Sequence, residues 1–271
     1  MVIFCTYSFY RINLGKIILI LRLKKVKVLH LSSEKTWRGG EQQIAYLIEE
    51  QRSMGVKLVV AARAESKFAE FCQQNAFDLH LFSFRNSLDF RTAFGLKKLI
   101  ARLKPDLIHV HSSKSHGIIA LTSLLGFYTP VILSRRVDFK LKSSGFSNWK
   151  YNIPQIKRIL CVSDEIRDIV RKDIKDPNRA QTVYSGVDLS RFSDVSQNHY
   201  LKHRYKLDDE AVLVGNTSAL ADHKDYFTFI DTAARFLQQH DQKIFFFIIG
   251  DGPMKEEIQQ YIASRSLTSN I

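Results

Sequence analysis

Short apolar stretches alternate with amphipathic ones from residue 26 onward, and this alternation limits the possible folds more than any other feature of the sequence. Short apolar runs predict strands, and apolar residues that recur every three or four positions predict helices. Strands are expected at 26–31, 57–61, 79–82, 107–111, 131–133, 159–162 and 181–183. Helices are expected at 65–74 and 89–103, after Gly39-Gly40, and from about Ser115 and Ser163. The order indicates an α/β protein whose parallel sheet is covered by helices on both faces.

A second series of strands and helices follows a polar stretch at 190–198. Strands are predicted at 211–214 and 243–249, the latter fully buried, with a helix from about Asp225 between them. The Gly250-Asp251-Gly252-Pro253 turn leads into another helix. A doubly wound domain usually needs five or six strands, and two are predicted here. We therefore expect an extension at 1–25, a complete domain at 26–190 and an incomplete domain at 191–271, as in a truncated product or one completed by another chain.

The composition is that of an ordinary globular protein, with 45% hydrophobic and 25% charged residues among 271. The cysteines, Cys5, Cys72 and Cys161, lie far apart without a CxxC pair. This spacing favours neither a disulfide framework nor a cysteine zinc site, and it suits a reducing cytoplasm.

The formal net charge is +13, and six of these positive charges lie in residues 1–27, which contain no acidic residue. A basic surface favours phosphate-bearing partners. Such partners are nucleic acids and anionic membrane surfaces. The sequence contains no recognisable nucleic-acid-binding motif, so a membrane surface is the preferred partner. Arg11 and Lys16 interrupt the apolar residues of 1–25 and argue against a spanning helix. We expect an extension outside the fold, with a membrane-surface segment or an anchor as alternatives.

Two loops in the first domain follow predicted strands, where parallel sheets bind ligands. Gly39 and Gly40 precede a helix and allow an anion to approach the backbone, although a simple tight turn is an alternative. His109 and His111 lie on the same face of their strand, with His111 at its carboxyl end. No third ligand lies nearby in the sequence, so a metal is not expected and His109 is interpreted as a buried structural residue.

Other candidates lie further along the chain. Lys224, in the 215–225 loop, either holds a diphosphate or is a surface lysine. Arg135 and Arg136 open a basic, aromatic stretch to residue 150, which is either an anion or acceptor site or a solvated loop. Ser163 is interpreted as a helix cap rather than a nucleophile. The i, i+4 pair His199 and His203 is expected on a solvated helix surface. The sequence contains neither a P-loop lysine nor GxGxxG, which disfavours an ATPase or dehydrogenase.

The order of several motifs resembles the family-4 retaining glycosyltransferases of the GT-B fold. The matching segments are Gly39-Gly40-Glu41, the Asp-Leu-Ile-His-Val-His strand ending at His111, Cys161-Val162-Ser163, Val183-Tyr184-Ser185-Gly186-Val187-Asp188, Lys224, and Ile249-Gly250-Asp251-Gly252-Pro253. The resemblance implies one Rossmann-like domain followed by the first part of a second. It also implies transfer of a sugar from a nucleotide-diphosphate donor to an acceptor hydroxyl with retention, without metal or cofactor.

The same resemblance assigns roles to individual residues. Lys224 would hold the diphosphate, and His111 would contact the donor sugar. The Gly39-Gly40 loop would approach the donor phosphate or the acceptor, and Gly252 would approach the donor. The implied acceptor is a glycan or lipid-linked molecule, in cell-envelope polysaccharide or glycolipid synthesis. The implied location is the cytoplasm, with peripheral attachment to the inner face of the membrane.

The sequence departs from the family pattern in two ways. The family commonly has an Arg five residues before Lys224, where this chain has Ala219. A Glu-x7-Glu segment, which holds the donor, is expected beyond the Gly-Asp-Gly-Pro turn and is absent. Activity of the chain is therefore an open question. A non-catalytic remnant that binds an acceptor or membrane is the alternative, and a sugar-nucleotide epimerase is disfavoured.

Overall fold

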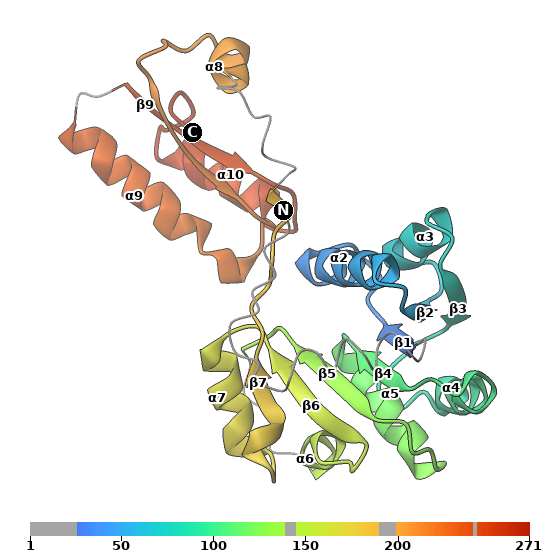
Figure 1. Cartoon of the computed structure of the whole chain (residues 1–271). Helices are drawn as coiled ribbons and strands as arrows, with labels where there is room; N and C mark the ends of the chain where they lie inside the picture. Colours follow the sequence, from blue (N-terminus) through green and yellow to red (C-terminus); the bar gives the residue numbers. More distant parts are fainter. Residues whose placement is uncertain (1–25, 139–144, 190–198, 241–242) are drawn as a thin grey trace, which may run out of the picture. The chain divides into compact units, whose positions relative to one another are not determined.

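The computed structural model describes residues 26–138, 145–189, 199–240 and 243–271. The chain divides between Leu189 and Ser190 into two compact units, here called unit 1 and unit 2 (Figure 1). The predictions for the 1–25 extension and the 190–198 stretch lie outside the described residues. Each unit is described by itself.

Unit 1 is built on a seven-stranded sheet in which every neighbouring pair is parallel. Its strands are β1 (Lys27–Ser32), β2 (Lys57–Arg63), β3 (Asp78–Phe82), β4 (Leu107–Val110), β5 (Val131–Arg135), β6 (Ile156–Cys161) and β7 (Ala180–Thr182). The spatial order is β3-β2-β1-β4-β5-β6-β7. The chain therefore builds outward from β1 in one direction, then returns and builds outward from β4 in the other.

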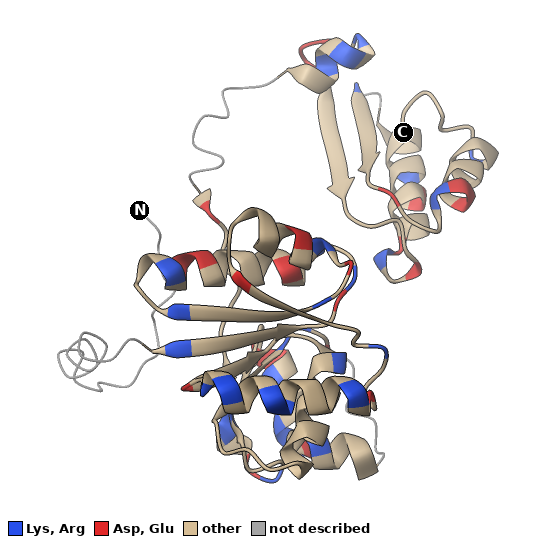
Figure 2. Ribbon diagram, turned by 90° about the vertical axis from the view of Figure 1, so that its right-hand side faces the viewer, with Lys and Arg blue, Asp and Glu red and all other residues tan. Residues whose placement is uncertain are grey.

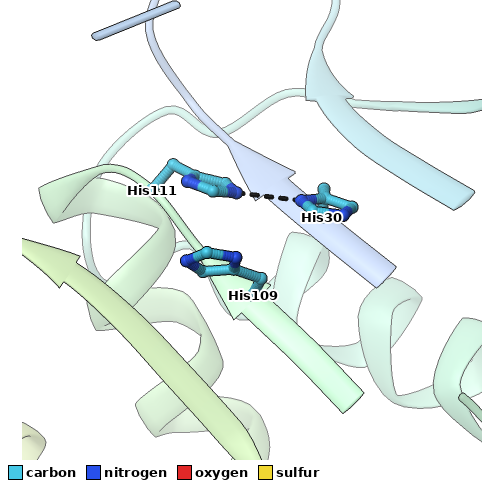
Figure 3. Close-up of side chains that lie close together, drawn as sticks. All are labelled: His30, His109 and His111. Carbon is cyan, nitrogen blue, oxygen red and sulfur yellow. Dashed lines mark hydrogen bonds between the residues drawn. The ribbon is translucent and has the colours of Figure 1, made fainter. Parts of the chain in front are cut away.

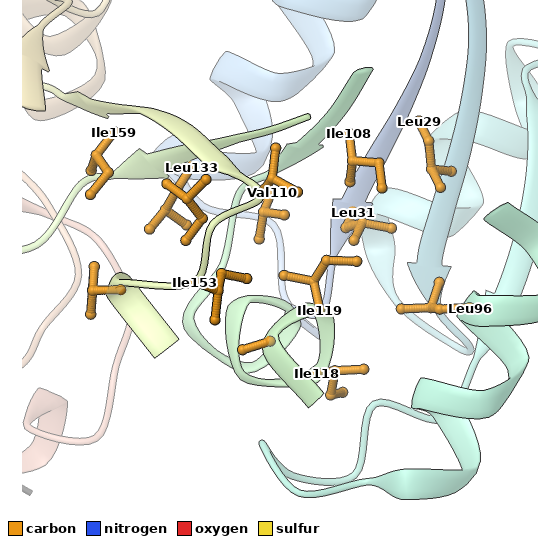
Figure 4. Packing of buried hydrophobic residues seen from close by; sticks show 14 of the residues in the cluster. Leu29, Leu31, Leu96, Ile108, Val110, Ile118, Ile119, Leu133, Ile153 and Ile159 are labelled. Atoms are coloured by element: carbon orange, nitrogen blue, oxygen red, sulfur yellow. The ribbon is translucent and has the colours of Figure 1, made fainter. Parts of the chain in front are cut away.

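Helices cover the two faces of this sheet because successive strand residues point to opposite sides. In β2, Val60 and Ala62 pack in one core with helices α2 (Gly39–Ser53) and α3 (Lys67–Gln74). Val59 and Ala61 belong to the larger core on the other face. There the covering helices are α4 (Phe90–Leu103), α5 (Ser113–Leu124), α6 (Gly145–Tyr151) and α7 (Asp164–Asp173). Figure 4 shows sheet residues such as Leu31 and Val110 beside Ile119 of α5.

The predicted elements of unit 1 are present, with local differences. β6 begins three residues before the prediction, because Lys157 and Arg158 interrupt its apolar pattern and lie exposed. α6 was not predicted, since its seven residues are too few for a clear helical period. Met54 follows the last residue of α2, Ser53, and is 61% exposed.

Unit 2 contains a parallel two-stranded sheet of β8 (Val212–Thr217) and β9 (Ile244–Ile249). The remaining elements are α8 (Tyr200–Tyr205), a 3-10 turn at Asp222–Lys224, α9 (Tyr226–Gln239) and α10 (Lys255–Ser264). Tyr226 and Ile230 of α9 pack with Ile258 and Ile262 of α10 in one core. β8 continues past the predicted end at Val214, so residues 215–217 are strand rather than loop.

The prediction that β9 is fully buried is wrong. Ile244 and Phe246 are buried, Phe245 and Phe247 are half-buried, and Ile249 is 46% exposed. The strand has one partner among the described residues, and the buried alternate positions pack with α9. Val212 and Val214 of β8 are likewise exposed. Unit 2 therefore presents apolar sheet surface, as expected for a domain with few strands.

No helix in the described part of the chain has the length and apolar character needed to cross a membrane.

Candidate active site

The order in which the chain adds strands to the sheet of unit 1 reverses between β1 and β4. Such a topological switch point opens a crevice at the carboxyl ends of the strands. β1 leads into Ser33 and the loop before α2. β4 leads directly into His111 and Ser112 at the start of α5. The N-termini of α2 and α5 therefore begin beside this crevice, where their free N–H groups favour anions.

Three histidines cluster at the switch point (Figure 3). His30 of β1 is the register partner of His109 in β4, and His111 follows on the same face. Nδ1 of His30 lies 3.0 Å from Nε2 of His111. The rings of His109 and His111 have centroids 4.0 Å apart. Sequence reasoning found His109 and His111 but missed His30, because the strands that place it beside them are far apart in the chain.

Each ring has a different environment on its outer side. Nε2 of His30 lies 3.0 Å from Oε1 of Gln51, near the C-terminus of α2. Nε2 of His109 lies 2.9 Å from the hydroxyl of Ser134 in β5. Nδ1 of His111 is buried and has no hydrogen-bond partner. The predicted burial of His109 is thus confirmed, at 6% exposed.

Burial lowers the pKa of all three histidines, because an imidazolium loses its hydration in the protein interior. The pKa of His30 falls to about 4, even though Gln51 favours its charged form. For His109 and His111 the pKa is lowered further below its ordinary value by neighbouring histidines and by the Arg136 guanidinium. The cluster is therefore neutral at pH 7.

Three imidazoles that each offer a ligand nitrogen within 4.8 Å of the others have the composition of a metal site. Two observations argue against a cation here. His30 and His111 already use facing nitrogens for a hydrogen bond to each other. Arg136 also places a positive charge beside His109 and His111, which disfavours a second cation and favours an anion.

A serine network joins the two strand ends beside the histidines. The hydroxyl of Ser112 lies 2.7 Å from that of Ser33 and 2.6 Å from that of Ser115. The backbone N–H of Ser33 donates to the Ser112 hydroxyl, and the Ser115 N–H donates to the Ser33 hydroxyl. These bonds satisfy part of the N-terminus of α5 and fix the two loops relative to each other.

The Gly39-Gly40 segment forms the first turn of α2, at the same edge of the sheet. A side-chain carbon at Gly40 would lie 3.9 Å from Cδ of Arg136, whereas Gly39 has no atom within 4 Å of that position. Arg136 donates from Nη1 to the Ser185 hydroxyl at 2.9 Å. Glu41, the residue after Gly40, is buried, and burial raises the pKa of its carboxyl. The fold thus places Gly40 and Arg136 together and puts Arg136 close enough to His111 to lower its pKa.

Arg135 points elsewhere, as expected for adjacent residues of a strand. Its guanidinium contacts the Tyr151 hydroxyl, and the ammonium of Lys150 lies 5.6 Å from the centre of the Tyr151 ring. Lys150 is 9% exposed, so the solvated-loop interpretation fails at this residue. Residues 139–144 of the basic stretch lie outside the described residues.

In unit 2, Lys224 is exposed at the end of the 3-10 turn, two residues before α9. The turn at Gly250–Gly252 supports the loop that leads to it. A side-chain carbon at Gly252 would lie 2.3 Å from the Leu220 carbonyl oxygen, and one at Gly250 would lie 2.0 Å from that of Ser218. Close backbone packing thus explains both glycines without a ligand.

The other candidates have structural roles. The Ser163 hydroxyl accepts from the Ile166 N–H at 3.2 Å, which confirms the predicted helix cap. Burial raises the pKa of the neighbouring Cys161 thiol to about 11, so this thiol is a poor nucleophile. Cys72 and Cys161 are both free thiols. His203 on α8 and His199, which immediately precedes this helix, are both exposed, as predicted.

Comparison with known proteins places these observations in a family. The model of Glycosyltransferase Family 4 matches residues 37–191, more than half of the chain. The chain therefore belongs to Glycosyltransferase Family 4. A UDP-Gal:alpha-D-GlcNAc-diphosphoundecaprenol alpha-1,3-galactosyltransferase from Escherichia coli is 23% identical over an alignment of 183 residues. The match covers 63% of this chain and 47% of the relative. The chain thus spans about half the length of that relative.

Solved structures share the fold at low sequence identity. The Anabaena protein HepE in complex with UDP matches with a TM-score of 0.74 and 16% identity, over 90% of this chain and 68% of that one. A glycosyltransferase from Rickettsia africae matches with a TM-score of 0.75 and 11% identity, over 92% of this chain and 67% of that one. These likenesses confirm the predicted GT-B fold.

Proposed function

We propose that the chain is a glycosyltransferase that moves a sugar from a nucleotide-diphosphate donor to an acceptor hydroxyl with retention of configuration. The observation that carries this proposal is the family match over 37–191, a segment that includes His111, Gly40 and Arg136 at the switch point. The E. coli relative acts on a UDP-sugar and a diphosphoundecaprenol-linked sugar. A nucleotide-sugar donor and a glycan or lipid-linked acceptor of the cell envelope are proposed here on that ground.

The chemistry requires stabilisation of negative charge. As the bond between the sugar and the diphosphate breaks, charge accumulates on the leaving phosphate, and fixed cations and N–H groups lower the barrier most in a dry site. In the proposed mechanism Lys224 supplies a cation, and His111 contacts the donor sugar. The acceptor binds near Gly40 and Arg136, where a cation and a helix N-terminus coincide. The mechanism uses no metal or cofactor.

Peripheral attachment to an anionic membrane is part of the proposal. The exposed side of α4 includes Phe90, 59% exposed, and Phe94, 54% exposed. Its basic residues are Arg91, Lys97, Lys98 and Arg102, and the helix contains no acidic residue. Figure 2 shows the basic residues of unit 1 in blue. Exposed aromatic residues among cations favour the headgroup region of an anionic bilayer.

The test is an assay of the purified chain with a panel of nucleotide sugars that includes UDP-galactose and UDP-glucose, with and without a diphosphoundecaprenol-linked sugar. We expect release of the nucleoside diphosphate that depends on the acceptor, and a product with the anomeric configuration of the donor by NMR. Binding of acceptor or membrane without transfer from any donor would favour the non-catalytic alternative. Conversion of a UDP-sugar into its C2 epimer would favour the epimerase alternative.

A further inference from the structure

We propose that Gln51 and His30 are positioning residues that hold His111 in one tautomer, with the proton on Nε2 and a lone pair on Nδ1. In this state Nδ1 of His111 is a hydrogen-bond acceptor for a hydroxyl of the sugar substrate. The hydroxyl as ligand rests on the proposed function, whereas the tautomer follows from contacts within unit 1.

The first step is the chain of hydrogen bonds from α2 to His111. A neutral imidazole has one N–H and one lone pair, so the partner of one nitrogen decides the state of the other. The amide oxygen of Gln51 only accepts, so the facing Nε2 of His30 has the proton. Nδ1 of His30 then has the lone pair, and Nε2 of His111, 3.0 Å away, must donate to it. The remaining nitrogen of His111, Nδ1, is left without a proton.

Arg136 supports the neutral form of His111 that this argument requires. Burial lowers the pKa of His111, and the Arg136 guanidinium adds to this effect, so the ring has one N–H and one lone pair. The reverse tautomer would leave a buried N–H at Nδ1 with no acceptor, which is unfavourable. The hydrogen-bond chain and the lack of an acceptor at Nδ1 both place the lone pair on Nδ1.

The chemistry of the ligand follows from the unsatisfied atoms. Nδ1 of His111 and Nε of Arg136 are both buried without a hydrogen-bond partner. A hydroxyl can donate to the lone pair of Nδ1, whereas an ionised phosphate oxygen only accepts and would repel that lone pair. Nδ1 is closed to solvent here, so contact requires a neighbouring side chain to move. A sugar hydroxyl therefore fits His111 better than a phosphate does.

The tautomer can be measured without any substrate. In ¹⁵N-histidine-labelled full chain at pH 7, long-range ¹H–¹⁵N correlation spectra distinguish the two tautomers of each neutral ring. We expect His30 and His111 both to have the proton on Nε2. A His111 with its proton on Nδ1, or a charged His111, would overturn the proposal.

Variants of Gln51 test the positioning role. Gln51→Leu removes the acceptor, so we expect His30 and His111 to lose their single tautomer and show a mixture. Gln51→Glu restores an acceptor and should restore the Nε2–H form of His111. Gln43→Leu, on the same helix but bonded to the Gly186 backbone, should leave both tautomers unchanged. An unchanged His111 spectrum in Gln51→Leu would show that Gln51 does not set the tautomer.

The hydroxyl contact is tested by comparing the ¹⁵N spectra of His111 with saturating UDP and with saturating UDP-glucose. A hydrogen bond accepted by Nδ1 should move its ¹⁵N resonance with UDP-glucose and not with UDP. A change with UDP alone would assign Nδ1 to the nucleotide, and no change on saturation with UDP-glucose would exclude the hydroxyl contact. Failure of both compounds to bind would count against the proposed function and remove the ligand part, while the tautomer is still decided by the unliganded spectrum.

Discussion

Nδ1 of His30 and Nε2 of His111 lie 3.0 Å apart across the boundary between β1 and β4, 81 positions apart in the sequence. The contact joins the two strands between which the strand order of the sheet reverses. It therefore connects the centre of the fold to the crevice where ligands bind in open parallel sheets.

The proposed site residues can be tested by truncation. We expect His111→Ala and Lys224→Ala each to lower kcat/KM for sugar transfer by about a hundredfold, the usual cost of removing one group that stabilises a transition state. His223→Ala is a matched control for Lys224, because it lies in the same exposed turn. Steady-state kinetics with the best donor of the panel provide the measurement. Wild-type rates in both variants would remove these assignments.

Ala219 offers a test by gain of function. It is exposed in the loop that leads to Lys224, at the position where the family commonly has an Arg. Ala219→Arg would add a second cation near the proposed diphosphate site, which is worth about 1 kcal/mol for an exposed charge. We expect the Kd for UDP to fall several-fold by calorimetry at low salt, with Ala219→Met as the uncharged control. Equal affinity in the two variants would argue that no diphosphate binds there.

The buried histidines predict a loss of stability in acid. The pKa of His30 is about 4 in the folded chain and about 6.5 when unfolded, so between these values the unfolded chain binds the extra proton. This difference corresponds to about 3 kcal/mol of stability, present above pH 6.5 and lost as the pH falls to about 4. His116 acts in the same direction, because burial lowers its pKa to about 3. Glu41 acts in the opposite direction, because burial raises its pKa.

The measurement is the urea concentration at the midpoint of unfolding of unit 1. Unfolding is monitored by circular dichroism at pH values from 7.5 to 4.5. We expect a steady fall over this range. Exposed His203→Gln should leave the pH dependence unchanged, whereas His116→Phe should reduce it. A midpoint that stays constant down to pH 5 would contradict the predicted neutrality of the cluster.

Gly252 should be intolerant of a side chain. Alanine would bring its Cβ to 2.3 Å from the Leu220 carbonyl oxygen, so either the turn or the 218–221 loop must shift. We expect a destabilisation of unit 2 of about 1–3 kcal/mol, typical of overpacking. Gly215→Ala is the control, because its Cβ would meet Phe247 at an ordinary 3.7 Å. Thermal unfolding followed by circular dichroism compares them, and equal melting temperatures would refute the packing role.

The membrane proposal predicts a role for α4. Phe90→Ser with Phe94→Ser should lower binding to vesicles that contain anionic lipid by at least tenfold, because each buried phenyl contributes about 1.5–3 kcal/mol. Tyr128→Ser, which removes a 99% exposed aromatic elsewhere in unit 1, should not. Co-sedimentation with vesicles gives the comparison. Loss of binding in the Tyr128 variant alone would move the membrane surface away from α4.

The local elements and their alternation can be predicted from the sequence pattern. Apolar runs and helical periods are local signals, so the pattern predicts the strand that leads into His111, the cap at Ser163 and the helix after Asp225. The β6 start, where Lys157 and Arg158 interrupt the pattern, and α6, with seven residues, were missed because the local signal there is weak.

Which of these residues contact one another depends on how the strands pair in the folded chain. Sheet order brings His30 to His111 and Gly40 to Arg136, and it turns Arg135 toward Tyr151 instead. It also buries Lys150, whose environment the sequence left open. It packs Gly252 against Leu220, where the resemblance implied contact with the donor. Strand pairing and register depend on contacts between segments far apart in the chain, and a local sequence pattern contains no information about such contacts.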